Sequence, residues 1–250
     1  LAVALLAQAL PEPALRASDL ADPALSVLDF EVDAEFAVTV ADDGILGERT
    51  LLTDTFRAAG TGRDYLYMRA LGHLPLLLHP RPGRVAVVAL GTGTTLGAVA
   101  LHARPEAIDV LEISPAVVRA APWFADVNAG ALADPRVRVI QGDARRVLAS
   151  RRGSYDVVTM EPLLPDSPLG VHLYTEEFYA IARAALAPGG LVAQWVPPHA
   201  LEPAVFDAVL DAFRRAFPWS GIWISASQVV LVGGEAAPAL AAERFPPAGA

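Results

Sequence analysis

The sequence predicts an α/β fold in which a small antiparallel β unit precedes a doubly wound parallel sheet. Short runs rich in Val, Ile and Leu recur between residues 85 and 196, and helical patterns separate them. This alternation is typical of parallel strands joined by right-handed crossovers. Alternating apolar positions with turn residues come before these runs, and two strand-like runs with no helix between them come after, which predicts antiparallel strands at both places.

The chain begins with an apolar, Pro-rich lead over residues 1–25. Its first ten residues are too few to span a membrane and lack the basic start of a signal peptide. Because the first residue is Leu1, we expect either the end of an upstream apolar segment or a trimmed end. Residues 26–62 follow as the small β unit, with its turn at Asp42–Gly44.

The larger domain covers residues 63–236, and residues 237–250 form a tail. A helical pattern over residues 63–79 and a loop at 80–83 open the domain. The predicted strands then follow at 85–90, 108–113, 137–143, 155–160, 191–196, 221–226 and 228–233. The last two are expected to form an antiparallel edge of the sheet.

Composition excludes several classes of function. The net charge is −9, and no run of basic residues could follow a phosphate backbone, so nucleic acid is not expected as a partner. The absence of Cys excludes disulfides, thiolate catalysis and Cys-ligated zinc. No metal is expected either, because the five histidines do not show the spacing of a metal site: His73, His79, His102, His172 and His199.

Ligands of doubly wound sheets bind at the carboxyl ends of the strands, so the residues that follow each strand are the candidates. Gly91-Thr92-Gly93 follows the first strand, where two glycines allow either an ordinary tight turn or a loop that a nucleotide-like ligand approaches closely. Glu112 ends the second strand, 21 residues after Gly91, and its carboxylate could accept both ribose hydroxyls or lie in solvent.

Gly142-Asp143 ends the third strand, and Ala144 begins the helical segment that follows. Asp143 either caps the following helix or accepts a hydrogen bond from an adenine amino group, and we place Ala144 with it among the cofactor-binding residues. Together with the Gly loop and Glu112, these residues predict a pocket for an adenosine moiety.

The fourth strand leads into VTMEPLLPDSPLGVHLYTEEFY, a segment with two acids, Glu161 and Asp166, before a helix that begins near Thr175. We interpret it as an active-site loop. His172 and His199 also follow strand ends, so a role as proton carriers stays open for both. Three aromatic residues are expected in the core instead: Phe178, Tyr179 and Trp195.

Several stretches together resemble the spermidine synthase family, especially its domains fused to membrane segments. They are RDYLYMRALGHLPLLLHPRPGRVAVVALGTGTT, LEISPAVV, DPRVRVIQGDARRVL, YDVV, LYTEEFY and LAPGGLVAQ, within residues 28–233. The resemblance implies a Rossmann-like fold of the class I S-adenosylmethionine-dependent methyltransferase type. It also implies a transferase that moves the aminopropyl group of decarboxylated S-adenosylmethionine to a di- or polyamine and releases methylthioadenosine.

The resemblance implies roles for individual residues. Gly91 and Gly93 would form the loop that binds the nucleoside, Glu112 would bind the ribose and Asp143 the adenine. Tyr67 would line the substrate pocket, and Gln194 matches the Gln that follows the family's fifth strand. The sequence departs from the family at three places. Thr92 stands where the family has an Asp that binds the aminopropyl amine. Met68 replaces a Gln, and Leu164 or Pro165 stands in place of the second acid of the loop. We therefore expect Glu161 and Asp166 to share the contact with the substrate amine.

Two other functions stay open at this point. A methyl transfer from S-adenosylmethionine to an unknown small molecule is favoured by Thr92, and a non-catalytic nucleoside-binding domain of a membrane-fused protein is favoured by the changed transfer residues. The cosubstrate is thus decarboxylated S-adenosylmethionine or S-adenosylmethionine, and the acceptor a small amine or other small molecule. The resemblance also allows a homodimer and a cytoplasmic location, with a membrane tether if an upstream segment exists.

Overall fold

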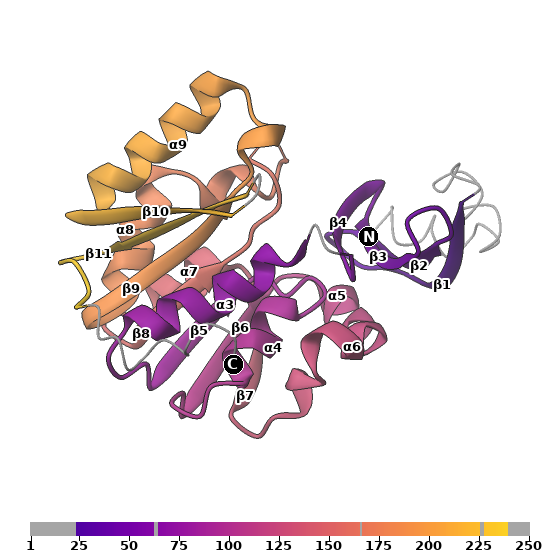
Figure 1. The fold of residues 1–250 in the computed structure, drawn as a ribbon, viewed down its shortest axis with the longest axis horizontal. Coiled ribbons are helices and arrows are strands. Elements are labelled where there is room, and N and C mark those ends of the chain that lie inside the picture. Colours follow the sequence, from indigo (N-terminus) through magenta and orange to yellow (C-terminus); the bar gives the residue numbers. More distant parts are fainter. Residues whose placement is uncertain (1–23, 63–64, 166, 226–227, 240–250) are drawn as a thin grey trace.

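The computed structural model describes residues 24–62, 65–165, 167–225 and 228–239, which fold into two sheets with helices around the larger one (Figure 1). Residues 1–23 of the predicted lead and residues 240–250 of the predicted tail lie outside these ranges. The two sheets confirm the predicted fold class, a small antiparallel unit followed by a doubly wound sheet.

The small sheet contains four antiparallel strands in chain order. They are β1 (Leu25–Val32), β2 (Ala37–Asp43), β3 (Glu48–Thr53) and β4 (Phe56–Gly60). The turn between β2 and β3 forms because Asp43 Oδ1 accepts hydrogen bonds from the backbone N–H groups of Ile45 and Leu46, each at 2.9 Å. The predicted break at Asp42–Gly44 overlaps this turn in part, because Asp42 and Asp43 end β2 and the turn covers residues 44–47.

The large sheet has seven strands in the order β10-β11-β9-β8-β5-β6-β7. Their bounds are β5 Arg84–Val88, β6 Ala107–Glu112, β7 Val137–Gln141, β8 Tyr155–Met160, β9 Leu186–Val196, β10 Trp219–Ser225 and β11 Gln228–Gly234. Strands β5 to β9 are parallel, whereas β11 pairs antiparallel with both β9 and β10. The chain runs outward from β5 through β6 to β7 and then returns to β8 on the other side, so the strand order reverses between β5 and β8.

Helices cover both faces of this sheet. They are α3 (Tyr67–Leu78), α4 (Thr94–Ala100), α5 (Pro115–Ala120), α6 (Ala125–Asn128), α7 (Ala144–Ala149), α8 (Glu176–Ala185) and α9 (Pro203–Ala216), with short 3₁₀ turns η2 (Ala121–Phe124), η3 (Ala131–Ala133), η4 (Val171–Leu173) and η5 (Pro198–Ala200). The first helix of the domain begins at Tyr67, within the predicted range of 63–79. Helix α8 begins after Thr175, whose Oγ1 accepts a hydrogen bond from the backbone N–H of Phe178 at 3.2 Å.

Alternation along β5 explains why its sequence is continuously apolar. Val85 and Val87 pack into the core shared with α3, α4 and α5, whereas Ala86 and Val88 pack into the core shared with α7, α8 and α9. Successive side chains of a strand point to opposite faces, so a strand covered on both sides needs apolar residues at every position. Phe178 and Tyr179 lie in the second core, as predicted.

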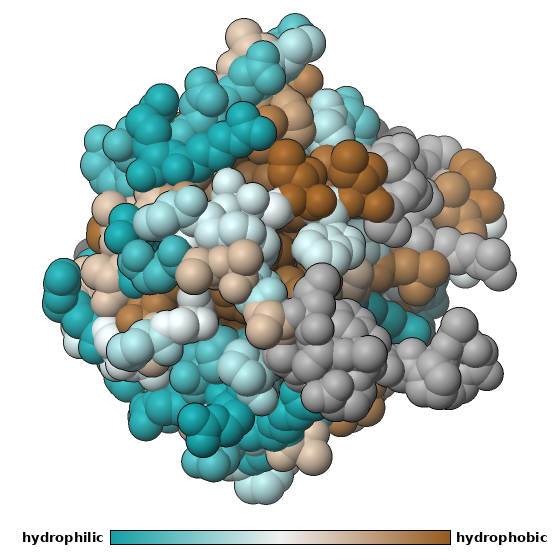
Figure 2. Space-filling view, turned by 60° about the vertical axis from the view of Figure 1, so that its left-hand side comes forward, coloured by the Kyte–Doolittle hydropathy of each residue, from teal (hydrophilic) through white to brown (hydrophobic). Residues whose placement is uncertain are grey.

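The small sheet stands beside the large one and contacts it through α5, which packs on β1 and β2 (Figure 1). Strand β10 forms the edge of the large sheet opposite β7, and it exposes the apolar side chains of Ile222, Trp223 and Ile224. Figure 2 turns the left-hand side of Figure 1 toward the viewer and shows hydrophobic residues at the surface in the upper middle of this face, with hydrophilic residues to their left. Within the described ranges, no helix is long and apolar enough to cross a membrane.

Candidate active site

A cavity lies at the carboxyl ends of β5, β6, β7 and β8, where the strand order reverses. The ends of these strands and the loops after them form its floor, at residues 88–92, 111–113, 142–145 and 161–163. The small sheet contributes one wall: Phe36, Leu51, Thr53, Phe56, Ala58 and Ala59. Ligands of open α/β sheets bind at this point, so the cavity is the candidate active site.

The Gly loop has the backbone that a close ligand contact requires. Gly91 and Gly93 adopt φ values of +52° and +79°, and Ala89 also has a positive φ of +65°. A left-handed conformation is unfavourable for a residue with a Cβ, which explains why glycine stands at two of these positions. Gly91 and Thr92 line the cavity. The Thr92 hydroxyl lies 2.8 Å from that of Thr94.

Asn128 holds this loop in place, although the sequence did not single it out. Its Nδ2 donates to the carbonyl oxygens of Thr92 and Ala121, each at 2.8 Å, and its Oδ1 accepts from the N–H of Gly130 at 2.9 Å. Asn128 is buried. The only signal in the sequence was that Asn128 is a polar residue within a largely apolar segment after the second strand. The sequence did not show that its partner is the Gly loop.

Glu112 ends β6 inside the cavity rather than in solvent. Its Oε2 accepts from the N–H of Leu90 at 2.7 Å and its Oε1 from the N–H of Ser114 at 2.9 Å. Burial raises the pKa of Glu112, and the backbone donors act against that rise. The carboxyl group is thus fixed beside the Gly loop, where ribose hydroxyls were expected to bind.

Asp143 caps α7 and also lines the cavity. Its Oδ1 accepts from the backbone N–H of Arg145 at 2.9 Å, and its Oδ2 accepts from Arg145 Nη2 at 2.7 Å. The side-chain hydrogen bond from Arg145 lowers the pKa of Asp143. Ala144 also lines the cavity. Capping, one of the two alternatives for Asp143, is therefore present, and an adenine contact would use the same carboxylate.

Glu161 lines the cavity and contacts Tyr67 of α3, which is not itself among the residues that line it. Tyr67 Oη donates to Glu161 Oε1 at 2.6 Å, and Thr95 Oγ1 donates to Glu161 Oε2 at 3.3 Å. Burial raises the pKa of Glu161 to about 7, while both hydrogen bonds oppose the rise. Burial also raises the pKa of Tyr67, which keeps its phenol a neutral donor. Glu161 can therefore change protonation state near neutral pH, as a general base must.

Trp195 belongs to the first hydrophobic core, as predicted, and it also borders the active site. Its ring stacks on Tyr67 with centroids 5.1 Å apart and an interplanar angle of 15°, and it lines the cavity. Met68 lines the cavity as well and is buried. Tyr67 is thus held from two sides, by a ring contact and by the hydrogen bond to Glu161.

Gln194 differs from the expectation for a cofactor-binding residue. It is fully buried within β9, is not among the residues that line the cavity, and donates from Nε2 to the carbonyl oxygen of Leu173 at 3.1 Å. The amide therefore supports the loop that ends at η4 instead of facing the cavity. Asp166, the second predicted catalytic acid, lies outside the described residues.

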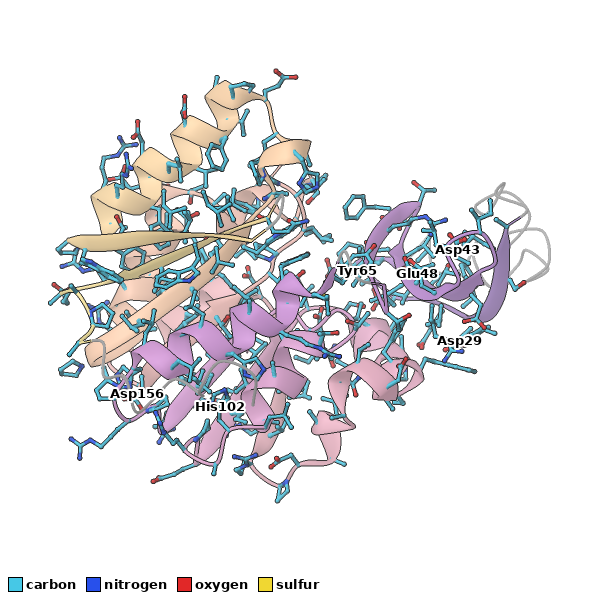
Figure 3. All side chains as sticks on the ribbon, in the orientation of Figure 1. Asp29, Asp43, Glu48, Tyr65, His102 and Asp156 are labelled. Carbon is cyan, nitrogen blue, oxygen red and sulfur yellow. The ribbon has the colours of Figure 1, made fainter. Side chains whose placement is uncertain are left out.

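The histidines separate into different environments. His172 lines the cavity, whereas His199 does not. His73 Nδ1 and His102 Nε2 lie 2.8 Å apart between α3 and the end of α4, and burial lowers the pKa of His102 to about 4 (Figure 3). In the part of the chain that the structure describes, no group of three or more His, Asp or Glu side chains is placed to hold a metal ion.

Comparison with protein families gives one match that covers most of the chain. Residues 64–226 match the family model described as the spermine/spermidine synthase domain. A polyamine aminopropyltransferase of Thermotoga neapolitana is 24% identical over 197 residues, which is 79% of this chain and 63% of the relative. A polyamine aminopropyltransferase of Mycobacterium tuberculosis is 40% identical over 141 residues, which is 54% of this chain and 27% of the relative.

The solved structures agree on the fold. A crystal structure of spermidine synthase in complex with the transition state analogue AdoDATO has a TM-score of 0.78 at 20% identity, covering 88% of this chain and 77% of that one. Human methyltransferase-like protein 13 in complex with SAH has a TM-score of 0.52 at 23% identity, covering 68% of this chain and 79% of that one. The chain spans less than two thirds of the length of the curated relatives described above. On the match over residues 64–226, the chain belongs to the spermine/spermidine synthase family.

Proposed function

We propose that the protein transfers the aminopropyl group of decarboxylated S-adenosylmethionine to a small di- or polyamine. The observation that carries this proposal is the Tyr67–Glu161 pair, which places a carboxyl group with a pKa of about 7 in the same cavity as Glu112. The relatives named polyamine aminopropyltransferase support the same reaction.

Some residues of the cavity would bind the nucleoside, and others would take part in proton transfer. Glu112 and Asp143 would hold the nucleoside, and the positive-φ turn at Gly91 would let it approach the backbone. The sulfonium of the donor supplies its own leaving group, so the protein mainly aligns the amine with the carbon next to sulfur. Stacking on Trp195 fixes Tyr67, and Tyr67 in turn orients Glu161.

The proposed reaction is a nucleophilic displacement. The amine nitrogen forms a bond to the aminopropyl carbon, and the carbon–sulfur bond breaks with its electron pair remaining on sulfur, which gives neutral methylthioadenosine. A diamine is largely protonated at pH 7, so one nitrogen must lose a proton before it can attack. Ionised Glu161 would accept that proton, and Asp166 stays a predicted second acid. The homodimer and the upstream membrane segment also stay predictions.

Formation of methylthioadenosine tests the proposal. The purified protein is incubated with decarboxylated S-adenosylmethionine and, separately, putrescine, cadaverine and spermidine, and methylthioadenosine is measured by chromatography. We expect release that depends on an amine, and no comparable turnover with S-adenosylmethionine as donor. Calorimetric preference for S-adenosylmethionine together with a methylated product would replace aminopropyl transfer by methyl transfer.

A further inference from the structure

We propose that Asp33, in the small sheet's first loop, is a positioning residue that sets the affinity of the cavity for its nucleoside. It acts through Ser114 on Glu112. The inference rests on the proposed function in that it takes the ligand beside Glu112 to be an adenosine-type nucleoside.

Three acids at alternate positions, Asp29, Glu31 and Asp33, face the large domain from β1 and the residue after it. Side chains two residues apart in a strand share a face, so this spacing directs all three toward the segment of α5 and η2. Asp29 accepts from Trp123 Nε1 at 3.3 Å, and Glu31 pairs with Arg119, whose Nε lies 2.7 Å from Oε2. Figure 3 shows Asp29 on the small sheet, on the side of that segment.

Asp33 differs from the other two acids because it contacts Ser114, and it makes two hydrogen bonds on each side of the junction. Its Oδ2 accepts from Ser114 Oγ at 2.5 Å and from the N–H of Ala116 at 3.1 Å. Its Oδ1 accepts from the N–H groups of Glu35 and Phe36, at 2.8 Å and 2.9 Å. Burial raises the pKa of Asp33, but these hydrogen bonds outweigh it, so the pKa is lowered and the side chain is ionised at neutral pH.

Ser114 connects Asp33 to the nucleoside end of the cavity. It is fully buried, and its backbone N–H donates to Glu112 Oε1 at 2.9 Å while its hydroxyl donates to Asp33. On the other side, the turn that Asp33 stabilises ends at Phe36, which lines the cavity. One carboxylate therefore fixes a polar group on the floor and an aromatic group in the wall. Hydrogen bonds to charged groups are the strong ones, and their loss would let both groups move.

The other two contacts of β1 provide matched controls. Glu31 and Arg119 are exposed, and exposed pairs contribute little to stability. Asp29→Asn and Glu31→Gln each remove one contact between the same two elements without touching Glu112, Ser114 or Phe36. They separate a general loosening of the small sheet from an effect that passes through Asp33.

The test is calorimetric titration of each variant with methylthioadenosine, together with its thermal unfolding. We expect Asp33→Asn to raise the Kd about tenfold, as loss of a charged hydrogen bond does. Both control variants should stay within about twofold of the wild type. If Asp33→Asn folds poorly, Asp33→Ser keeps an acceptor for the turn and gives the same comparison. The affinity effect of combining Asp33→Asn with Ser114→Ala should be less than the sum of the two single effects.

Steady-state kinetics add a measurement that a purely structural role would not change. Asp33→Asn should raise KM for the donor and leave kcat and the KM of the amine close to those of the wild type. An unchanged Kd, an equal loss in Glu31→Gln, or a wild type that does not bind methylthioadenosine would each overturn the inference. A wild type that binds the nucleoside and shows the Asp33 effect, but does not transfer an aminopropyl group, would overturn the proposed function alone.

Discussion

Replacing Glu161 with Gln should change the stability of the protein in a way that depends on pH. Burial raises the pKa of Glu161 from its ordinary value of 4.5 to about 7. Between these two values the folded protein keeps a proton that the unfolded chain releases, so the folded state loses stability as the pH rises through this window. Gln carries no such proton, so the variant does not have this loss, and its amide oxygen can still accept from Tyr67.

The size of the effect follows from the pKa difference. Each pH unit of difference corresponds to about 1.4 kcal/mol, which sets an upper limit of about 3 kcal/mol for the whole window. Glu161 lies on the wall of the cavity and keeps part of its surface in contact with solvent. Solvent screens part of the cost of ionisation, so we expect about 2 kcal/mol between pH 5 and pH 8.

Urea unfolding followed by Trp fluorescence measures this difference. The free energy of unfolding of Glu161→Gln, minus that of the wild type, should be larger at pH 8 than at pH 5. The exposed Glu177 provides a control, since Glu177→Gln removes the same charge without removing a buried carboxyl group and should show a small, constant difference. A difference for Glu161→Gln that is the same at both pH values would refute the account of a buried carboxyl group with a raised pKa.

Three further predictions concern the residues around the cavity. Tyr67→Phe removes a hydrogen bond that favours ionised Glu161, so the pH at which activity rises should shift upward, and the rate at pH 7 should fall about tenfold; an unchanged pH profile would contradict this. Asn128→Ala removes the side-chain donor to two buried carbonyl groups and should lower the free energy of unfolding by about 2–3 kcal/mol in urea. Gly97→Ala places a Cβ 2.6 Å from the carbonyl oxygen of Asn128, so it should destabilise by about 1–3 kcal/mol; equal stability would show that the helix can move away.

The sheet and the acids at its strand ends could be predicted because both depend on local patterns. Val85 to Val88 are apolar at every position because both faces of β5 are buried, and this is visible in the sequence. Glu112 is the last residue of β6 and Glu161 directly follows β8, so the rule that ligands bind at the carboxyl ends of parallel strands predicted both of them. Their burial and the raised pKa of Glu161 required the structure.

Other site residues depend on contacts between distant segments. Asp33 and Ser114 are 81 positions apart in the chain, and Tyr67 and Glu161 are 94 apart. The alternating acids of β1 were a visible signal, but nothing in the sequence identified α5 as their partner. The cofactor contact of Gln194 stays a prediction. Its amide bonds to Leu173 instead of lining the cavity, and because the side chains of a strand alternate between two faces, the sequence did not show which way this amide points.

The pH dependence of methylthioadenosine release shows whether Glu161 is the general base, when the wild type and Glu161→Gln are compared at saturating donor and amine. A general base contributes about 10²–10⁴-fold, so the variant should lose at least about a hundredfold in kcat while its Kd for methylthioadenosine stays within about twofold. Wild-type kcat should rise through pH 7 as Glu161 ionises, and the variant should not show this rise. A Glu161→Gln variant with the kcat and pH profile of the wild type would contradict the account.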